Sequence, residues 1–130
     1  MNIEKPKVVT LCGSSRFVDV MAVCAWLIER DEQAIAMGLH LLPGWYPNLQ
    51  PDHIAEHEGV AAAMDALHLR KIDLSDEIFV VNVGGYVGES SGREIEYAKK
   101  LGKPIRWFTH DVIGLQVKEM IDKAIASRAA

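Results

Sequence analysis

The loop Gly13-Ser14-Ser15-Arg16 carries residues suited to binding an anion. It follows a β-branched run at residues 8–12, and a glycine there allows the backbone to turn tightly. The serines can cap a following helix, whose free N–H groups and dipole favour a negative charge. Arg16 adds a forked, permanently charged donor that fits phosphate. The same residues also fit an ordinary capped turn with a solvated arginine, and the loop alone leaves both interpretations open.

A second candidate is Glu94, which follows the glycine-rich loop at residues 84–92. This loop lacks the lysine of a P-loop and the G-x-G-x-x-G spacing of dinucleotide sites. Helical spacing puts Glu94 on the same face as Ala98 and Leu101, which predicts a buried, ionised carboxylate suited to nucleophilic attack or ion stabilisation. Alternatively, residues 91–94 match the capping box S-x-x-E, in which the glutamate only bonds back to the helix start.

Histidines supply two further patterns. His53-Ile54-Ala55-Glu56-His57 matches H-x-x-E-H, a zinc-hydrolase pattern, but short patterns arise often by chance. We therefore interpret it as the polar first turn of a helix and predict no metal. His68 shares a helical face with Asp65 and is expected either to reach a ligand cleft or to lie on the helix surface.

The elements that position these residues alternate between strands and helices. This alternation predicts an α/β fold with a parallel sheet of order 2-1-3-4 and helices on both faces. Ligands in such sheets bind where the winding direction changes, at the carboxyl ends of the first and third strands, which is where both loops lie.

Trp26 fits the buried stripe of the first helix. The predicted strands are residues 8–12, 39–42, 78–83 and 104–108, and the helices run from about 17 to 37, 51 to 71, 91 to 101 and from 112 onward.

Composition sets the broad class. The 130 residues fit a single domain, 1–130, and 49% apolar with 25% charged residues is typical of a globular protein. A net charge of −4 argues against binding to a nucleic-acid polymer, and the apolar runs are too short for a membrane span. Two cysteines, Cys12 and Cys24, without a disulfide framework predict a cytoplasmic protein.

The order and spacing of three motifs resemble the nucleoside 2-deoxyribosyltransferase family, including its 2′-deoxynucleoside 5′-phosphate N-hydrolase and CMP N-glycosidase members. The motifs are residues 12–16 (Cys-Gly-Ser-Ser-Arg), residues 75–81 (Ser-Asp-Glu-Ile-Phe-Val-Val) and residues 94–98 (Glu-Ile-Glu-Tyr-Ala). The resemblance implies a flavodoxin-like fold and cleavage of an N-glycosidic bond with a glutamate nucleophile, here Glu94. It also implies a homodimer or larger homo-oligomer and no cofactor.

The resemblance further assigns roles to single residues. Gly13, Ser14, Ser15 and Arg16 match the loop of members that accept nucleoside 5′-monophosphates. Phosphate contacts are also expected in the second loop, from Gly88, Ser90 and Ser91. The position of the aspartate that assists the leaving base carries His68 in this chain, and Asp65 lies one turn earlier.

Three other functions remain open. One is a non-catalytic module that senses a nucleotide through the same cleft, and another is a transferase acting on free nucleosides. The third is a phosphoribohydrolase, whose glycine-rich motif is half matched by residues 83–88.

Overall fold

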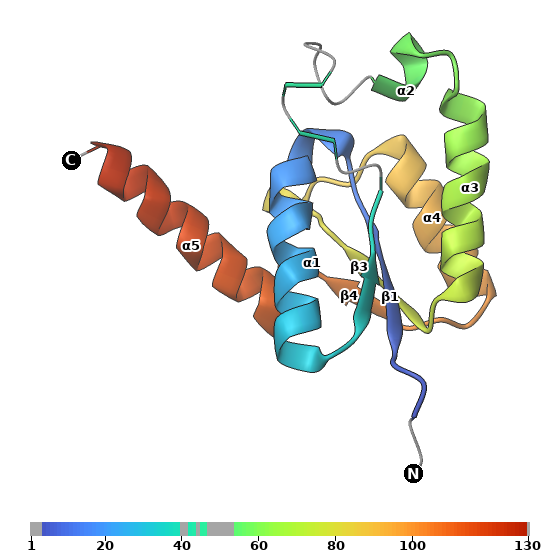
Figure 1. The fold of residues 1–130 in the computed structure, drawn as a ribbon, viewed down its shortest axis with the longest axis horizontal. Coiled ribbons are helices and arrows are strands. Elements are labelled where there is room, and N and C mark those ends of the chain that lie inside the picture. Colours follow the sequence, from blue (N-terminus) through green and yellow to red (C-terminus); the bar gives the residue numbers. More distant parts are fainter. Residues whose placement is uncertain (1–3, 40–41, 44, 47–53, 130) are drawn as a thin grey trace.

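The computed structural model describes residues 4–39, 42–43, 45–46 and 54–129 (Figure 1). Strands and helices alternate along the chain as the sequence predicts. The elements are β1 (Val8–Cys12), the 3₁₀ turn η1 (Ser15–Phe17), α1 (Val18–Glu32), β2 (Ile35–Met37), α2 (Ile54–His57), α3 (Ala61–Leu74), β3 (Glu77–Val80), the 3₁₀ turn η3 (Val83–Gly85), α4 (Glu89–Lys100), β4 (Ile105–Trp107) and α5 (Val112–Ala129).

The four strands form one parallel sheet of order β2-β1-β3-β4, which confirms the predicted topology and the flavodoxin-like arrangement. Helices α1 and α5 lie on one face of the sheet, and α3 and α4 lie on the other (Figure 1). Because β1 and β3 have helices on both sides, their side chains are buried on both faces, as a continuous β-branched and aromatic run requires. None of the helices among the described residues is both long and apolar enough to cross a membrane.

The second strand lies earlier in the chain than predicted. Helix α1 ends at Glu32 because Gln33 adopts a left-handed conformation (φ 55°), and β2 follows at once at Ile35–Met37. Gly38 therefore does not end the helix. The predicted strand at 39–42 is wrong for Leu39 and Leu42, which the structure describes outside any strand. His40 and Leu41 lie outside the described residues.

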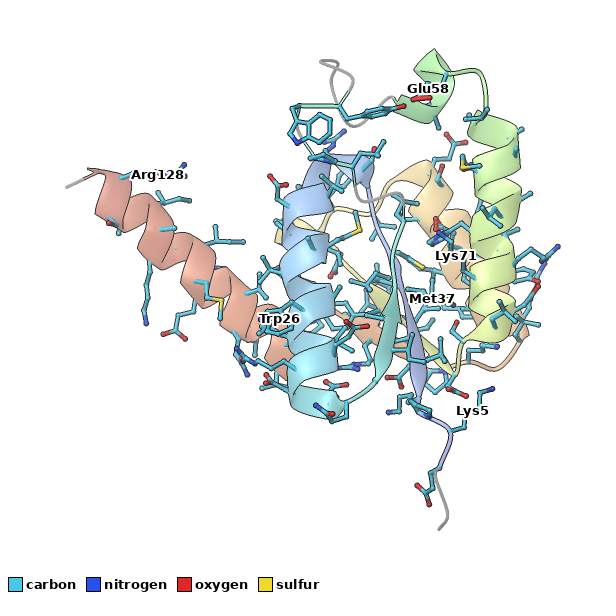
Figure 2. The ribbon with its side chains drawn as sticks, in the orientation of Figure 1. Lys5, Trp26, Met37, Glu58, Lys71 and Arg128 are labelled. Carbon is cyan, nitrogen blue, oxygen red and sulfur yellow. The ribbon has the colours of Figure 1, made fainter. Side chains whose placement is uncertain are left out.

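Two further expectations fail. The predicted helix from 51 to 71 is two helices, α2 and α3, which Gly59 separates with a φ of 73°. Residues 51–53 lie outside the described part. Trp26, labelled on α1 in Figure 2, is 60% exposed and does not belong to the buried stripe. The buried positions Cys24, Leu27 and Ile28 define that stripe, and position 26 points away from it.

An ionic cluster joins the helices to the sheet. The Arg106 guanidinium on β4 contacts Glu32 at 2.7 Å, Glu77 at 3.0 Å and Asp111 at 2.9 Å. It also lies 5.2 Å from the ring centroid of Phe79. This one side chain therefore connects the end of α1, the start of β3 and the segment that leads into α5.

Candidate active site

One cavity of about 240 Å³ lies at the carboxyl ends of β1 and β3. It is bounded by both loops, by α3 and by the first turns of α4. All ten residues that the sequence nominates line this cavity: Gly13, Ser14, Ser15, Arg16, Asp65, His68, Gly88, Ser90, Ser91 and Glu94. Residues scattered over some eighty positions of the chain are thus brought together where the topology predicts a ligand.

The first loop passes close to the end of β3. A Cβ atom at Gly13 would lie 3.2 Å from the carbonyl oxygen and 3.3 Å from the Cβ of Val81, so a side chain there would crowd the sheet. Ser14 caps the short η1 turn, because its Oγ accepts a hydrogen bond from the backbone N–H of Arg16 at 3.3 Å. The predicted serine cap on the helix itself is wrong, because α1 begins after Phe17 and has no side-chain cap. The Arg16 side chain is exposed at the rim of the cavity.

Tyr86 connects the two loops. Its ring centroid lies 4.6 Å from the Arg16 guanidinium carbon and 6.2 Å from the Phe17 ring centroid, in an edge-on arrangement. The turn before it depends on Gly84 and Gly85, which both adopt positive φ angles, 63° and 84°. A cation–π contact of this kind positions Arg16 at the cavity. The sequence marked this loop as unusual but did not indicate the role of Tyr86.

Helix α4 begins at Glu89, and this corrects the capping-box interpretation of residues 91–94. Its N-cap is Gly88, which has no side chain to cap the helix, and the first helical bond runs from the Gly92 N–H to the Gly88 carbonyl. Ser91 is therefore inside the helix, so Glu94 does not reach back to cap it. The residues of this first turn line the cavity, and their N–H groups have no side-chain cap, which is a favourable position for an anion.

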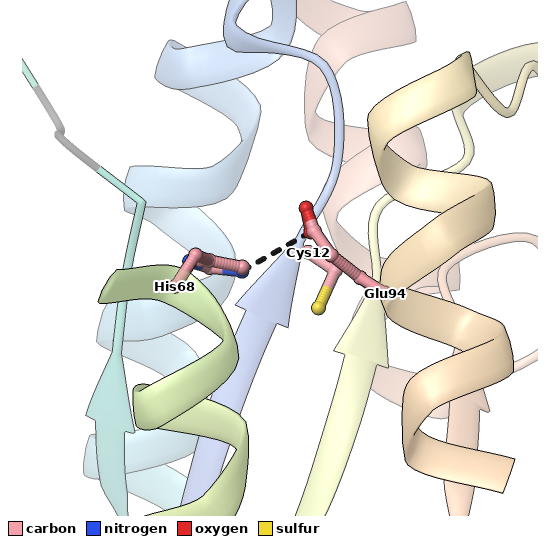
Figure 3. Close-up of side chains that lie close together, drawn as sticks. All are labelled: Cys12, His68 and Glu94. Atoms are coloured by element: carbon pink, nitrogen blue, oxygen red, sulfur yellow. Dashed lines mark ion pairs between the residues drawn. The ribbon is translucent and has the colours of Figure 1, made fainter. Parts of the chain in front are cut away.

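Glu94 lies on the buried face of α4, as predicted, with 8% of its surface exposed. Its Oε2 lies 3.3 Å from Nε2 of His68, which is 2% exposed (Figure 3). The expectation of an ionised carboxylate is wrong in this structure. Burial, and then the negative charge of Asp65, raise the pKa of Glu94 to about 8, although the Arg93 guanidinium acts in the opposite direction.

Asp65 and Ser90 occupy the outer part of the cavity. The Asp65 side chain is 59% exposed and lies 3.8 Å from the Arg93 guanidinium. Arg93 also donates a hydrogen bond to the Ser90 Oγ at 3.1 Å. His68 is thus the buried neighbour of Glu94, and Asp65 acts on Glu94 only through its charge.

Cys12 is the residue that the sequence analysis missed. It ends β1, is fully buried, and its Sγ forms a group with one donor atom each of His68 and Glu94, all within 4.8 Å of one another (Figure 3). Burial and the charge of Glu94 raise the pKa of the Cys12 thiol well above its usual value. No local sequence pattern could indicate this group, because its members lie at positions 12, 68 and 94 on three different elements.

The structure describes only part of the segment that matches H-x-x-E-H. His53 lies outside the described residues, and Glu56 is exposed and lines the cavity. Glu96 lies on the exposed side of α4, where it pairs with Lys99 at 3.3 Å.

In comparisons with known proteins, no protein-family model, no curated protein and no solved structure matches the chain.

Proposed function

We propose that the protein cleaves the N-glycosidic bond of a nucleoside or deoxynucleoside 5′-monophosphate, with Glu94 as the nucleophile. One observation carries the proposal: a buried carboxylate lines the same cavity as Arg16 and the uncapped first turn of α4. The carboxylate suits covalent attack on a sugar carbon. The rim suits the phosphate at the other end of the same molecule.

The chemistry needs only side chains of the cavity. A carboxylate oxygen of Glu94 attacks the anomeric carbon, and the bond from that carbon to the base nitrogen breaks. The electron pair of this bond goes to the base, which takes a proton from His68 or, as the alternative, from Asp65. The product is a glycosyl ester of Glu94, which water or a second base then cleaves, and the carboxylate is regenerated. Only the ionised fraction of Glu94 attacks.

The phosphate is proposed to lie between Arg16 and the first turn of α4. A guanidinium binds phosphate through paired hydrogen bonds, and the uncapped N–H groups at Glu89, Ser90 and Ser91 add further donors. The contact between Arg16 and Tyr86 supports this placement, because it holds the guanidinium at the cavity rim. A free nucleoside would leave these donors without a partner.

The test is chromatographic detection of free base. The wild-type chain is incubated with ribo- and deoxyribonucleoside monophosphates, with and without a free acceptor base. We expect base release that Glu94→Gln reduces by about 10³-fold or more. Glu96→Gln is the matched control, because Glu96 lies half a turn away on α4 and pairs with Lys99 on the surface. Full activity of Glu94→Gln would refute the mechanism.

Nucleotide sensing without turnover is the second candidate. Burial favours this function, because the raised pKa of Glu94 leaves its carboxyl group largely protonated at neutral pH. Arg16 and the first turn of α4 could also bind a phosphate without any contribution from Glu94. Tight binding of a monophosphate by calorimetry, with no base released from any monophosphate or free nucleoside, would favour this function.

Location and assembly belong to the same proposal. The two cysteines are free and buried, which suits a reducing cytoplasmic compartment. A homodimer or larger homo-oligomer is expected from the motif resemblance, and sedimentation velocity tests it.

A further inference from the structure

The cluster of Cys12, His68 and Glu94 combines a thiol, an imidazole and a carboxyl group, the three side-chain types that bind zinc in proteins. Cys12 ends β1, His68 lies on α3 and Glu94 lies on α4, so three elements bring the side chains to one point (Figure 3). One donor atom of each lies within 4.8 Å of the other two. We propose that these three side chains bind one thiophilic divalent cation of the zinc type.

The distances suit such an ion. Zinc lies about 2.3 Å from a thiolate sulfur and about 2.0–2.2 Å from imidazole nitrogen or carboxylate oxygen, so its tetrahedral ligands are separated by about 3.5 Å. The contact between Nε2 of His68 and Oε2 of Glu94, at 3.3 Å, already has this separation. A thiolate ligand favours Zn²⁺ or Co²⁺ over Mg²⁺ and Ca²⁺.

The burial of the three side chains also favours a bound cation. Cys12, His68 and Glu94 are 0%, 2% and 8% exposed, and Oε2 of Glu94 accepts no hydrogen bond from the described residues. A buried carboxylate is costly unless positive charge lies beside it, and a dication held by all three side chains would add charge to that of the His68 contact.

The cavity gives the ion a way in. His68 and Glu94 line the cavity wall, whereas Cys12 lies behind them at the end of β1. Three protein ligands with one side open to a cavity are the arrangement of an exchangeable zinc site rather than a closed structural one. This site is distinct from the H-x-x-E-H pattern, which shares no residue with it.

The cation and the proposed reaction exclude one another. An ion on Oε2 of Glu94 occupies the carboxylate that attacks the sugar, so zinc is expected to inhibit base release. This consequence rests on the proposed function, but binding of the ion does not.

Cobalt binding tests the site directly. The chain is stripped with a chelator, freed of it and titrated with Co²⁺. We expect one Co²⁺ per chain, with a thiolate-to-cobalt charge-transfer band in the near ultraviolet that Zn²⁺ abolishes. Cys12→Ser is expected to lose the band. Cys24→Ser is the matched control and should keep it, because Cys24 is also buried but lies on the buried face of α1, in the core on the other side of the sheet.

Two results overturn the proposal: the absence of a band in the wild-type chain, or a band that persists in folded Cys12→Ser. Should Cys12→Ser fail to fold by circular dichroism, Glu94→Gln carries the test, with Co²⁺ affinity expected to fall at least about tenfold. Undiminished affinity in that folded variant overturns the site. Base release is assayed separately from metal binding. If the wild-type chain binds the metal but Glu94→Gln keeps full base release, the metal site stands and only the proposed glycosidase mechanism is refuted.

Discussion

Nε2 of His68 lies 3.3 Å from Oε2 of Glu94, and both side chains are buried at the wall of one cavity. The two residues come from facing helices, α3 and α4, that pack on the same side of the sheet. In the proposed reaction Glu94 would be the nucleophile and His68 the proton donor, so the two groups would already be adjacent before a substrate binds.

His68→Asn is expected to slow base release by about 10²–10⁴-fold, the usual cost of losing a general acid. The loss should be smaller for a monophosphate whose base is more acidic, such as 5-fluorouracil, because that base leaves with less help. Single-turnover rates for uracil and 5-fluorouracil substrates measure the difference. An equal loss for both would mean that His68 acts only structurally.

Arg16→Ala is expected to raise KM for the monophosphate about tenfold to a hundredfold, since charge-assisted hydrogen bonds contribute about 1.5–3 kcal/mol. The KM for the corresponding free nucleoside should not change. Arg30→Ala is the control, because Arg30 forms a surface pair with Asp31 on α1. Steady-state kinetics on both substrates check this, and an equal rise in both KM values would exclude a phosphate role.

Tyr86→Ala is expected to raise the same KM about two- to fivefold, while Tyr86→Phe should behave as the wild type. Only the ring contributes to the contact with Arg16, and an exposed cation–π pair contributes about 0.5–1 kcal/mol. The variants are compared again in an Arg16→Ala background, where the effect of Tyr86→Ala should disappear. Persistence of the effect there would show that Tyr86 acts on its own.

Glu94→Gln is expected to gain stability relative to the wild type as the pH rises. The pKa of Glu94 is about 8 in the folded chain and about 4.5 in the unfolded chain. Between these values the unfolded state loses the proton first, so wild-type stability falls with rising pH and the penalty is complete above pH 8. At about 1.4 kcal/mol per pH unit, its upper bound is about 5 kcal/mol.

Urea unfolding of both proteins at pH 5 and pH 9, with chelator present, measures this penalty. The variant should gain more at pH 9 than at pH 5. The same advantage at both pH values would show that Glu94 titrates normally.

Gly114→Ala is expected to destabilise the fold by about 3 kcal/mol, the upper part of the range for overpacking. A Cβ at Gly114 in α5 would overlap the backbone oxygen of Phe108, so the start of α5 or the segment before it must shift. Gly92→Ala in α4 meets nothing within 4 Å and should stabilise its helix by about 0.5–1 kcal/mol. Thermal unfolding of the two variants checks the contrast, and similar melting temperatures would contradict it.

The topology could be predicted because the signals for β1, β3 and α4 are local and agree with one another. The position of β2 could not, because Gln33, rather than a glycine, takes the left-handed conformation that ends α1. Trp26 was misplaced because its apolar side chain is compatible with either face of a helix. Seven of the ten cavity residues followed from the two loops that the topology brings together. Glu94 followed from helical spacing, and Asp65 and His68 followed from the motif resemblance. Cys12 was missed because its proximity to His68 and Glu94 exists only in the folded chain.

The ionic cluster around Arg106 lies toward the amino end of the sheet, since Glu77 begins β3 and Glu32 ends α1. The cavity lies at the opposite, carboxyl end. Substitutions in the two loops therefore leave the main ionic anchor of the fold untouched. This separation makes the architecture evolvable, because the loops at the cavity can change their sequence while the chain keeps its capacity to fold.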